Sequence, residues 1–463
     1  MQKWTREEKD QILNERDEKR LSLLHQQIRQ SIWRGQYHIQ TVTGLMNDPN
    51  GFSFFNGKWH LFYQWFPFGP EHGMKHWAHV ESENLLDFKW SEEMLVPDQE
   101  YEKNGCYSGN SIEADGKLYL FYTANYKSEQ GKIPKQAMAW MEPDGSIHKY
   151  ENNPIIDETP EGLIGEIRDP FVFQKDGWYY MLLGGGTLEG KAALLLYQST
   201  DLTSWKYQGL IDVCADGLDM GYMYECPSYI QVDGKDVLFL SLMGREPEGD
   251  RYHNEFSSLY FIGNLNLEEM RFEVECYDEI DKGFDFYAPQ VFYGKDKAPM
   301  MIAWFGCGVQ HSPYAAEDMW IHGLTMPRIL KIQNGQLYQE IPEEISDKYE
   351  MVSDLTHMPE SNTWKLSLDF DKIQCSCVQI GEKKDCFKIN LDVDHGVVSV
   401  DRSSLSKEIC GKYGYTRRVT TKSGKLYSLD IYYDNTFIEL DVNKGEEWMA
   451  FRAYPENQQI KIK

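Results

Sequence analysis

One short phrase recurs between residues 57 and 294 at nearly constant spacing, and this repeat limits the possible folds more than any other feature. It is usually an Asn-Gly or Asp-Gly pair followed by an apolar run, as in "NGKWHLFYQ", "DGKLYLFYT", "DGWYYMLLG" and "DGKDVLFLS", with a weaker fifth copy in "YGKDKAPMMIAWFG". The glycines of the five copies, Gly57, Gly116, Gly177, Gly234 and Gly294, are 59, 61, 57 and 60 residues apart. Each phrase predicts a tight hairpin turn between two strands. A fixed period of this length predicts that one supersecondary unit is stacked several times.

The period also predicts the architecture of most of the chain. About sixty residues suit a four-stranded propeller blade with generous loops, and five copies suit a closed ring. We therefore expect an all-β protein in which residues 36–335 form a five-bladed β-propeller. In residues 336–463 the repeat stops, and alternating segments such as "KLYSLDIYYDNTFIELDV" predict an antiparallel β-sandwich. Thr5 and Glu8 have the spacing of a capping box, so residues 1–35 are expected to form a short N-terminal helical segment.

Composition excludes several classes of partner. The chain has 47 basic and 73 acidic side chains and a formal net charge of −26, which disfavours binding to nucleic acid. No apolar run approaches the roughly 20 residues of a membrane span, and the N-terminus is too charged to be a signal peptide. The nine cysteines include no C-x-x-C pair, so neither a disulfide framework nor a zinc site is expected. We expect a cytoplasmic protein that does not bind a membrane, and no pattern specifies its oligomeric state.

Three carboxylates occupy equivalent places in the repeat. Asp48 lies 9 residues before its glycine, Asp169 lies 8 before and Glu225 lies 9 before, and a proline follows each within two positions. For Asp48 alone, in "NDPNG", a plain β-turn would explain the sequence. Equivalent strand ends of different blades surround the axis of a propeller, however, so we expect the three acids to converge. Crowded carboxyls have raised pKa values, and glycoside hydrolysis is the leading reaction that uses one protonated and one ionised carboxyl.

Seven motifs then occur in a characteristic order: "LMNDPNG" (45–51), "FYQ" (62–64), "HWAH" (76–79), "YSG" (107–109), "RDP" (168–170), "ECP" (225–227) and "DFYAPQ" (285–290). Together they resemble glycoside hydrolase family 32, the β-fructofuranosidases, over the whole predicted propeller. The resemblance implies a five-bladed propeller followed by a β-sandwich, in agreement with the repeat. The chain departs from the family at Ala78, where glycine is usual, and at His72, where several members have a tryptophan that meets the substrate. Residues 434–441 also lack the usual paired serines and phenylalanine.

The resemblance implies a role for each acid. Asp48 would be the nucleophile that attacks the anomeric carbon of a fructosyl unit, Glu225 the acid/base, and Asp169 the group that stabilises the transition state. The substrate-binding positions that it implies are Leu45, Asn47, Gln64, His72, Trp77, Tyr107, Ser108, Arg168, Tyr287 and Trp304. No metal and no cofactor is expected, because the acids are spread over three blades with no histidine cluster beside them.

Several of these residues also have a purely structural explanation. The three aromatic residues Trp77, Tyr287 and Trp304 would by default belong to the core. Asn47 and Ser108 could be turn residues, and Arg168 could be only the counter-ion of Asp169. Gln64 favours a function, because a polar side chain in an aromatic strand needs a buried partner. Cys226 is expected to be a packed thiol.

The expected substrate is a small β-fructofuranoside. The segment "HGMKHW" (72–77) resembles that of bacterial sucrose-6-phosphate hydrolases, and His72, Lys75 and His76 are candidate phosphate ligands, although they could be ordinary loop residues. Unphosphorylated sucrose is a close alternative, and longer fructans are disfavoured. Two other classes remain open: an inverting arabinan- or xylan-type propeller hydrolase, because "RDP" occurs there as well, and a catalytically inactive sugar-binding protein. The Asn-Asp-Pro-Asn turn argues against the first, and the presence of all three acids argues against the second.

Overall fold

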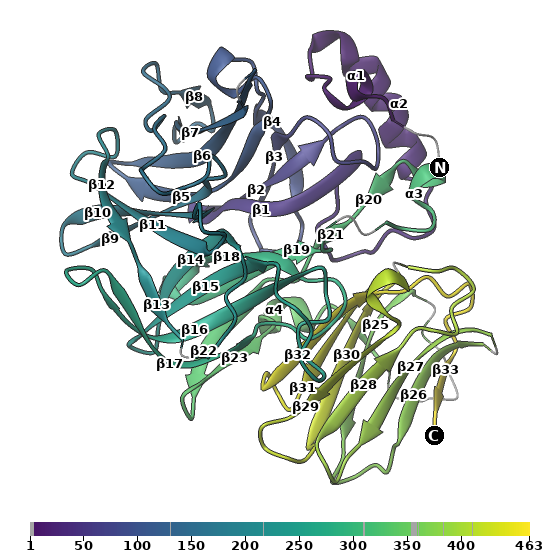
Figure 1. Ribbon diagram of the computed structural model, residues 1–463. Helices are drawn as coiled ribbons and strands as arrows, with labels where there is room; N and C mark the ends of the chain where they lie inside the picture. The colour runs from purple at the N-terminus through teal and green to yellow at the C-terminus, as the bar shows by residue number, and fades with distance from the viewer. Residues whose placement is uncertain are drawn as a thin grey trace.

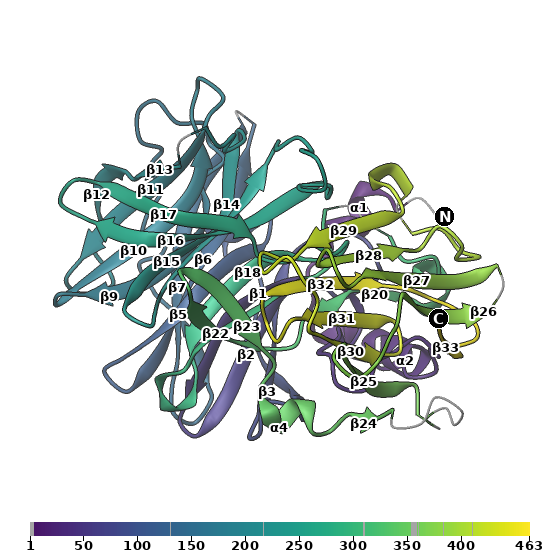
Figure 2. The same cartoon turned by 90° about the horizontal axis from the view of Figure 1, so that it is seen from below.

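The protein consists of a ring of β-sheets beside a two-layered sheet structure, as the computed structural model shows (Figure 1). The structure describes residues 4–129, 131–215, 217–308, 311–352, 359, 361–382, 384–409 and 411–463. Figure 2, turned by 90°, shows that the two-layered part, which is coloured green to yellow, lies against one side of the ring. Among the described residues, no helix is long and apolar enough to cross a membrane.

Five sheets form the ring, and each is built from strands that follow one another in the chain. Their strands are β1 (Gly44–Phe55), β2 (Lys58–Phe66), β3 (His76–Ser82) and β4 (Lys89–Leu95); β5 (Cys106–Ala114), β6 (Lys117–Ser128), β7 (Gly131–Met141) and β8 (Ile147–Lys149); β9 (Arg168–Lys175), β10 (Trp178–Gly186), β11 (Ala192–Ser199) and β12 (Lys206–Leu210); β13 (Asp212–Cys214), β14 (Met223–Val232), β15 (Lys235–Met243), β16 (Phe256–Asn266) and β17 (Arg271–Glu279); and β18 (Tyr287–Tyr293), β19 (Pro299–Phe305), β21 (Gly323–Leu324), β22 (Arg328–Gln333) and β23 (Gln336–Glu340).

The innermost strands of the five sheets close the ring. Strands β1, β5, β9, β14 and β18 each contact the next, and β18 returns to contact β1. A short strand, β20 (Trp320–Ile321), lies in the chain between β19 and β21 of the fifth sheet but pairs in parallel with β1 of the first. The predicted five-bladed propeller is therefore confirmed.

In four blades the repeated phrase forms the turn between the innermost strand and the strand that follows it. Asn56, Asp115, Asp176 and Asp233 have φ between 47° and 51°, and the glycines after them also have positive φ. This left-handed conformation is what a two-residue hairpin turn requires and what Asn-Gly and Asp-Gly adopt at low cost. In the fifth copy, Gly294 instead precedes a 3₁₀ turn, η3 (Lys295–Lys297). The constant period therefore comes from one hairpin made again in each blade.

The N-terminal segment contains two separate helices. These are α1 (Arg6–Lys9) and α2 (Glu18–Ile28), which is preceded by the 3₁₀ turn η1 (Glu15–Asp17). The capping box is present: Glu8 N–H donates to Thr5 Oγ1 at 3.2 Å, and Thr5 N–H donates to Glu8 Oε2 at 2.7 Å. A second cap at Asn14 starts η1, so the predicted helical segment is divided into two parts. The remaining short helices are η2 (Glu100–Glu102), α3 (Ala315–Asp318), α4 (Glu343–Ser346) and η4 (Gly411–Tyr413).

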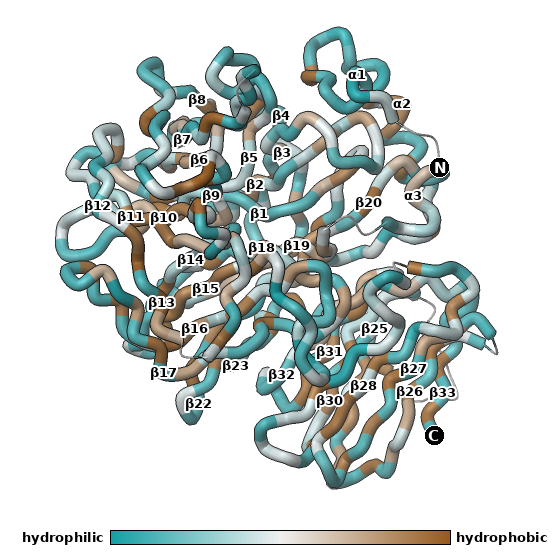
Figure 3. The backbone as a smooth tube through the Cα atoms, in the orientation of Figure 1, coloured by the Kyte–Doolittle hydropathy of each residue, from teal (hydrophilic) through white to brown (hydrophobic). Residues whose placement is uncertain are grey.

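Two five-stranded sheets form the predicted sandwich. One has the order β24 (Glu350–Met351), β25 (Thr363–Asp369), β30 (Ser428–Asp434), β31 (Phe437–Val442) and β32 (Glu447–Arg452); the other has β29 (Thr416–Thr420), β28 (Val397–Asp401), β27 (Asp385–Asp392), β26 (Cys377–Glu382) and β33 (Ile460–Ile462). Buried residues such as Trp364, Phe387 and Phe451 fill the space between them. Figure 3 shows hydrophobic and hydrophilic residues alternating along strands of the sandwich. Strands β31 and β32 are buried on both faces, however, so the outer face of their sheet is not wet there.

Strand β23 bears on the domain boundary. The predicted boundary at residue 335 would assign residues 336–340 to the sandwich, but β23 pairs with β22 in the fifth blade. The reason is the Asn334-Gly335 turn, which ends the repeat in the sequence but joins two strands of one blade. We therefore propose that the propeller extends to about residue 341.

Candidate active site

A cavity of about 690 Å³ opens at one end of the propeller axis. Its lining includes Asp48, Asp169 and Glu225, which belong to β1, β9 and β14, the inner strands of three blades. Beneath the acids, Pro49, Pro170, Pro227 and Pro289 surround a void of only about 10 Å³. The site is therefore a blind pocket, and its floor includes Pro49, Pro170 and Pro227, which follow the three acids in the sequence.

Hydrogen bonds hold the carboxylate of Asp48 in one orientation. Oδ2 accepts from Ser108 Oγ at 2.5 Å and from Gln64 Nε2 at 3.1 Å, and Oδ1 accepts from Asn47 Nδ2 at 3.1 Å. Gln64 Nε2 also contacts Ser108 Oγ. Burial raises the pKa of Asp48, and the hydrogen bonds from Ser108 and Asn47 oppose this rise only in part.

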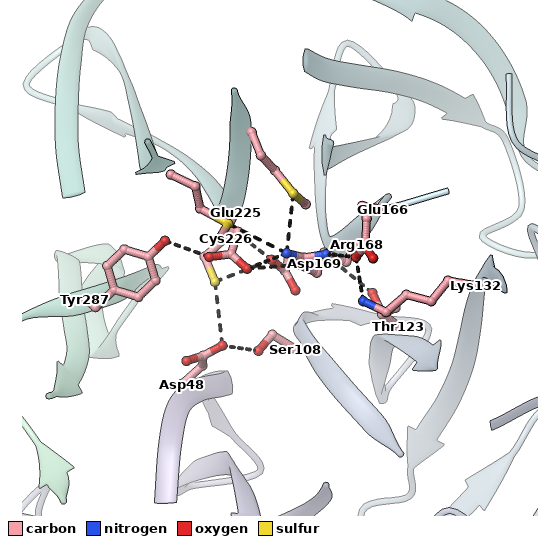
Figure 4. A network of polar contacts seen from close by, with 12 residues as sticks. Asp48, Ser108, Thr123, Lys132, Glu166, Arg168, Asp169, Glu225, Cys226 and Tyr287 are labelled. Atoms are coloured by element: carbon pink, nitrogen blue, oxygen red, sulfur yellow. Dashed lines mark hydrogen bonds and ion pairs between the residues drawn. The ribbon is translucent and has the colours of Figure 1, made fainter. Parts of the chain in front are cut away.

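The carboxyl group of Glu225 is bound on both oxygens. Arg168 donates from Nε and Nη2 to Oε1 at 2.9 and 2.8 Å, and Tyr287 OH donates to Oε2 at 2.7 Å (Figure 4). Arg168 also donates from Nη1 to Glu166 Oε2 at 2.5 Å. The carboxylates that accept hydrogen bonds from this guanidinium are therefore Glu225 and Glu166, and Nη2 also contacts the sulfur atoms of Met223 and Met243. These contacts do not fit a residue that is only the counter-ion of Asp169.

Asp169 and Cys226 both have left-handed backbone conformations, with φ of 64° and 46°. Strained backbone of this kind in non-glycine residues is concentrated at functional sites. The backbone N–H of Cys226 donates to Asp169 Oδ2 at 2.9 Å, and its thiol lies 3.6 Å from the same oxygen and 3.8 Å from Asp48 Oδ2. Burial raises the pKa of Asp169, while the positive charge of Arg168 opposes the rise. Cys226 is therefore packed, as expected, and its place is between two of the acids.

Most of the predicted binding residues lie around this cavity. Its lining includes Asn47, Gln64, His72, Tyr107, Arg168, Tyr287 and Trp304. Trp304 is only 3% exposed, and its indole N–H has no hydrogen-bond acceptor in the part of the chain that the structure describes. A buried donor without an acceptor at a cavity wall is suited to receive a hydroxyl oxygen of a ligand.

Three predicted residues lie behind the lining. Leu45 packs with Phe66 and Ile321, next to the parallel pair of β1 and β20. Trp77 is fully buried on β3, two strands from the axis, and its indole donates to the carbonyl of Tyr107 at 2.9 Å. Neither side chain reaches the cavity, so both support its walls. Ser108 reaches the site only through Asp48 and Gln64.

Of the three candidate phosphate ligands, two line the cavity and one does not. His76 is completely buried, and its ring contacts Leu13 N–H at 3.0 Å and the carbonyl of Met74 at 3.1 Å. It does not line the cavity, so the suggestion that it binds phosphate is wrong for this structure. Lys75 and His72 do line the cavity, and Lys75 Nζ donates to Asn47 Oδ1 at 2.5 Å. The side chain of Asn47 therefore links Lys75 to the carboxylate of Asp48.

Part of the wall was not anticipated from the sequence. Trp4, Arg6, Lys9 and Asp10 enter from the N-terminal segment, and Lys127 and Lys132 enter from the hairpin between β6 and β7. These residues lie outside the repeated phrase and outside the seven motifs. The one signal in the sequence is the group of lysines on both sides of Ser128, which concerns Lys127 and Lys132 alone.

The chemistry of the site is that of carboxylates. Among the described residues, no group of three or more His, Cys, Asp or Glu side chains is placed to hold a metal ion. Two acids from different blades, one oriented by neutral donors and the other by a guanidinium and a phenol, can serve as nucleophile and as acid/base. A five-bladed propeller that gathers three acids at one end of its axis defines a propeller-type glycosidase.

Comparison with known sequences identifies the family. The family described as "Glycosyl hydrolases family 32 N-terminal domain" matches residues 38–341, and the chain therefore belongs to glycosyl hydrolase family 32. It is 32% identical to a sucrose-6-phosphate hydrolase of Staphylococcus xylosus, with 100% of this chain and 96% of the relative covered. It is 34% identical to a sucrose-6-phosphate hydrolase of Pediococcus pentosaceus, with 94% of this chain and 88% of the relative covered.

Solved structures agree with the fold. A sucrose-6-phosphate hydrolase from Lactobacillus gasseri superimposes with a TM-score of 0.89 at 30% identity, covering 99% of this chain and 96% of that one. A family 32 β-fructofuranosidase of Bombyx mori, in complex with sucrose, superimposes with a TM-score of 0.81 at 28% identity, covering 97% and 96%. Both similarities extend over the propeller and the sandwich.

Proposed function

We propose that this protein is a retaining β-fructofuranosidase that releases fructose from sucrose-6-phosphate. The observation that carries the proposal is the placement of Asp48, Asp169 and Glu225 around one blind pocket, in a chain of family 32. The similarity to sucrose-6-phosphate hydrolases over the full chain supports the choice of substrate. Sucrose itself is the second candidate, because the similar β-fructofuranosidase of Bombyx mori was solved in complex with sucrose.

The first half of the reaction forms a covalent intermediate. A carboxylate oxygen of Asp48 attacks C2 of the fructosyl unit while Glu225 gives its proton to the glycosidic oxygen. The C2–O bond to the leaving sugar breaks, and an ester between Asp48 and C2 forms. The hydrogen bonds from Asn47, Gln64 and Ser108 support this role because they fix the direction of the attacking carboxylate.

The second half releases fructose. Glu225, now ionised, takes a proton from a water molecule, whose oxygen attacks C2 and expels the carboxylate of Asp48. Two displacements at one carbon retain its configuration, and retaining glycosidases hold the two carboxyls about 5–5.5 Å apart. In this proposal Asp169 accepts hydrogen bonds from fructose hydroxyls that strengthen in the transition state, and its burial and its hydrogen bond from the N–H of Cys226 support this role.

The experiment that tests the function measures fructose release from sucrose and from sucrose-6-phosphate. We expect Glu225→Ala to lower kcat about a hundred- to ten-thousand-fold, the usual contribution of general acid–base catalysis. Asp48→Ala should lose at least as much, because no covalent intermediate can form. Asp157→Ala, at an exposed carboxylate outside the cavity, is the matched control and should keep wild-type activity.

The anomer of the first fructose formed separates the alternatives. A retaining enzyme gives β-fructose first, observed by NMR before mutarotation, whereas an inverting arabinan-type hydrolase would give the opposite anomer from its substrate. If wild type releases no fructose from either sugar but binds one of them, the protein is a sugar-binding protein instead. The predicted cytoplasmic location is consistent with a phosphorylated substrate and stays part of this proposal.

A further inference from the structure

Two lysines face each other directly in the hairpin of β6 and β7. Lys127 and Lys132 are register partners in this antiparallel pair, so their Cβ atoms lie about 4.5–5.5 Å apart on one face of the sheet. Like charges placed directly opposite each other destabilise a sheet. Both side chains also line the cavity that holds the three acids. The hairpin therefore presents two cations to the ligand at a cost to its own stability.

A chain of ion pairs connects this lysine pair to the acid/base. Lys132 Nζ lies 2.6 Å from Glu166 Oε2, Glu166 lies 2.5 Å from Arg168, and Arg168 lies 2.8 Å from Glu225 (Figure 4). Glu225 gives its proton to the leaving group, so this chain leads from the cleaved bond toward the hairpin. Lys132 is about one-third exposed, and Glu166, its one carboxylate partner among the residues that the structure describes, is shared with Arg168.

The local charge balance favours an anionic ligand. The chain of ion pairs and Lys127 together contain three cations, Lys127, Lys132 and Arg168. They contain two carboxylates, Glu166 and Glu225. This excess stands out in a chain with 73 acidic and 47 basic side chains. Lys127 is exposed to the cavity, and no ion pair of Lys127 occurs among the described residues. It is therefore free to bind a charged group of the ligand.

The opposite wall offers cations that are already neutralised. Arg6 pairs with Asp10 at 3.3 Å, and Lys9 pairs with Glu71 at 3.0 Å, so each has a carboxylate of its own. Lys75 is committed to Asn47 and His72 beside the nucleophile. The hairpin is thus the part of the wall with unbalanced positive charge.

We propose that Lys127 and Lys132 form the receptor for the phosphate group of the leaving sugar. The inference rests on the proposed function, and it deepens that function by assigning the specificity for a phosphorylated substrate to one hairpin. Each ammonium group donates charge-assisted hydrogen bonds to phosphate oxygens. The ligand chemistry is a sugar phosphate monoester, whose dianion also relieves the repulsion between the two lysines.

The experiment compares kcat/KM for sucrose-6-phosphate with kcat/KM for sucrose in wild type, Lys127→Gln, Lys132→Gln and the double variant. We expect the ratio of the two constants to fall about tenfold for each lysine, the value of one hydrogen bond to a charged group. Lys135→Gln is the matched control, because Lys135 lies on the same strand but stacks on Tyr126 at 4.7 Å, away from the cavity. Its ratio should equal that of wild type. Thermal unfolding of each variant checks that the hairpin still folds.

Binding gives a second measurement that does not need catalysis. Calorimetry with glucose 6-phosphate, glucose and inorganic phosphate should show that wild type prefers glucose 6-phosphate to both others, and that the double variant loses this preference. Tighter binding of inorganic phosphate than of glucose 6-phosphate would mean an anion site unrelated to the sugar and would overturn the proposal.

The outcomes separate the two proposals. If wild type prefers sucrose-6-phosphate and the lysine variants keep that preference, the receptor is elsewhere and this inference is wrong, while the function stands. Loss of the preference in Arg6→Gln or Lys9→Gln alone would assign it to the opposite wall. If wild type hydrolyses sucrose as fast as sucrose-6-phosphate, the phosphate receptor is wrong but the fructosidase is not. If neither sugar releases fructose, the proposed function itself fails.

Discussion

At the scale of single residues, Lys75 is a buried cation close to the proposed nucleophile. Its ammonium group donates to Asn47 Oδ1 at 2.5 Å and contacts His72 Nδ1 at 3.2 Å. Burial lowers the pKa of Lys75 to about 7, although the charge of Asp48 opposes this. Conversely, the positive charge of Lys75 lowers the pKa of Asp48, which burial has raised. The charge of Lys75 therefore helps to keep the nucleophile ionised in acid.

Lys75→Met should move the acid limb of the activity profile. Below about pH 7 the wild-type lysine is charged, so its removal raises the pKa of Asp48 and leaves less carboxylate at low pH. We expect the acid limb of kcat/KM to shift to higher pH and activity at pH 5 to fall more than activity at pH 7. The measurement is the pH dependence of sucrose hydrolysis. Lys191→Met, at an exposed lysine, is the control, and an acid limb unchanged by Lys75→Met would contradict the argument.

The residue scale also shows what a repeat can and cannot locate. Counting from the hairpin glycines predicted that Asp48, Asp169 and Glu225 converge, and they lie on the innermost strands of three blades, because equivalent positions in a propeller share one end of the axis. Trp77 could not be placed in this way. Trp77 belongs to a motif, but β2 lies between its strand and the innermost strand β1. The spacing of motifs does not indicate how far a residue lies from the propeller axis.

At the scale of elements, the N-terminal segment acts as a wall of the cavity. Trp4 packs edge-on against Phe66, with ring centroids 5.8 Å apart, and covers Gly69 so closely that a Cβ there would lie 2.0 Å from its ring. The carbonyl of Lys9 accepts from Met74 N–H at 2.7 Å. The capping box predicted the helix, but these contacts depend on loops 60 residues further on, which no local pattern specifies.

Removal of residues 1–8 should widen the pocket on this side. The deletion removes Trp4 and Arg6 from the lining but keeps Lys9, whose carbonyl holds the loop that carries His72 and Lys75. We expect the rate on 1-kestose or inulin, relative to sucrose, to rise several-fold, because longer fructosides then meet a lower wall.

Two single variants sharpen the deletion experiment. Trp4→Ala should change the relative rates in the same direction to a smaller extent. Trp178→Ala, which removes a tryptophan that is 42% exposed on β10, is the matched control and should leave the relative rates as they are in wild type. A narrower preference for sucrose after the deletion would mean that the segment binds long substrates and does not exclude them.

At the scale of the whole molecule, buried charges join the propeller to the sandwich. Arg328 on β22 contacts Glu439 on β31 at 2.5 Å and Asp281 at 3.0 Å. His38 lies 2.8 Å from Asp434 and 2.9 Å from Glu439 through its two ring nitrogens. All five side chains are inaccessible to solvent. A buried cluster of this kind fixes one relative placement of two domains, since removal of one partner leaves an uncompensated charge.

The cluster predicts how stability depends on pH. Burial alone would lower the pKa of His38, but its hydrogen bonds to Asp434 and Glu439 outweigh burial and raise the pKa to about 9. A raised pKa stabilises the fold below the ordinary value of about 6.5, and this contribution is lost as pH rises through 9. The pKa of Glu439 is lowered to about 2 despite its burial, chiefly by Arg328, so its contribution is lost only as pH falls from about 4 toward 2.

His38→Gln should therefore flatten the alkaline side of the stability curve. We expect the contribution of His38, measured as the difference in the free energy of unfolding between wild type and variant, to fall by on the order of 3 kcal/mol between pH 6.5 and 9.5. The variant should therefore be less stable than wild type at pH 6.5 and approach the stability of wild type at pH 9.5. Denaturant unfolding at several pH values measures both quantities, with the exposed His148→Gln as control. If the free energy of unfolding depends on pH in the same way in wild type and in His38→Gln, then the imidazole of His38 is not charged in the folded protein.

The two domains differ in how far the sequence predicts them. The ring follows from the period, because identical units can pack on one another only in a few ways. The contact between ring and sandwich depends on His38, Arg328 and Glu439, which come from three separate regions of the chain. Their pairing is a matter of tertiary structure, and no spacing in the sequence indicates it.

Closure of the ring has a consequence for the synthesis of the protein. Strand β1, which carries Asp48, contacts β18 of the last blade, and His38 contacts Asp434, which is 396 positions further along the chain. A ribosome that has translated as far as residue 285 has already made all three acids but not Tyr287 or Trp304. The incomplete chain therefore has catalytic groups without a pocket, and hydrolysis begins only after the last blade has emerged and joined the first.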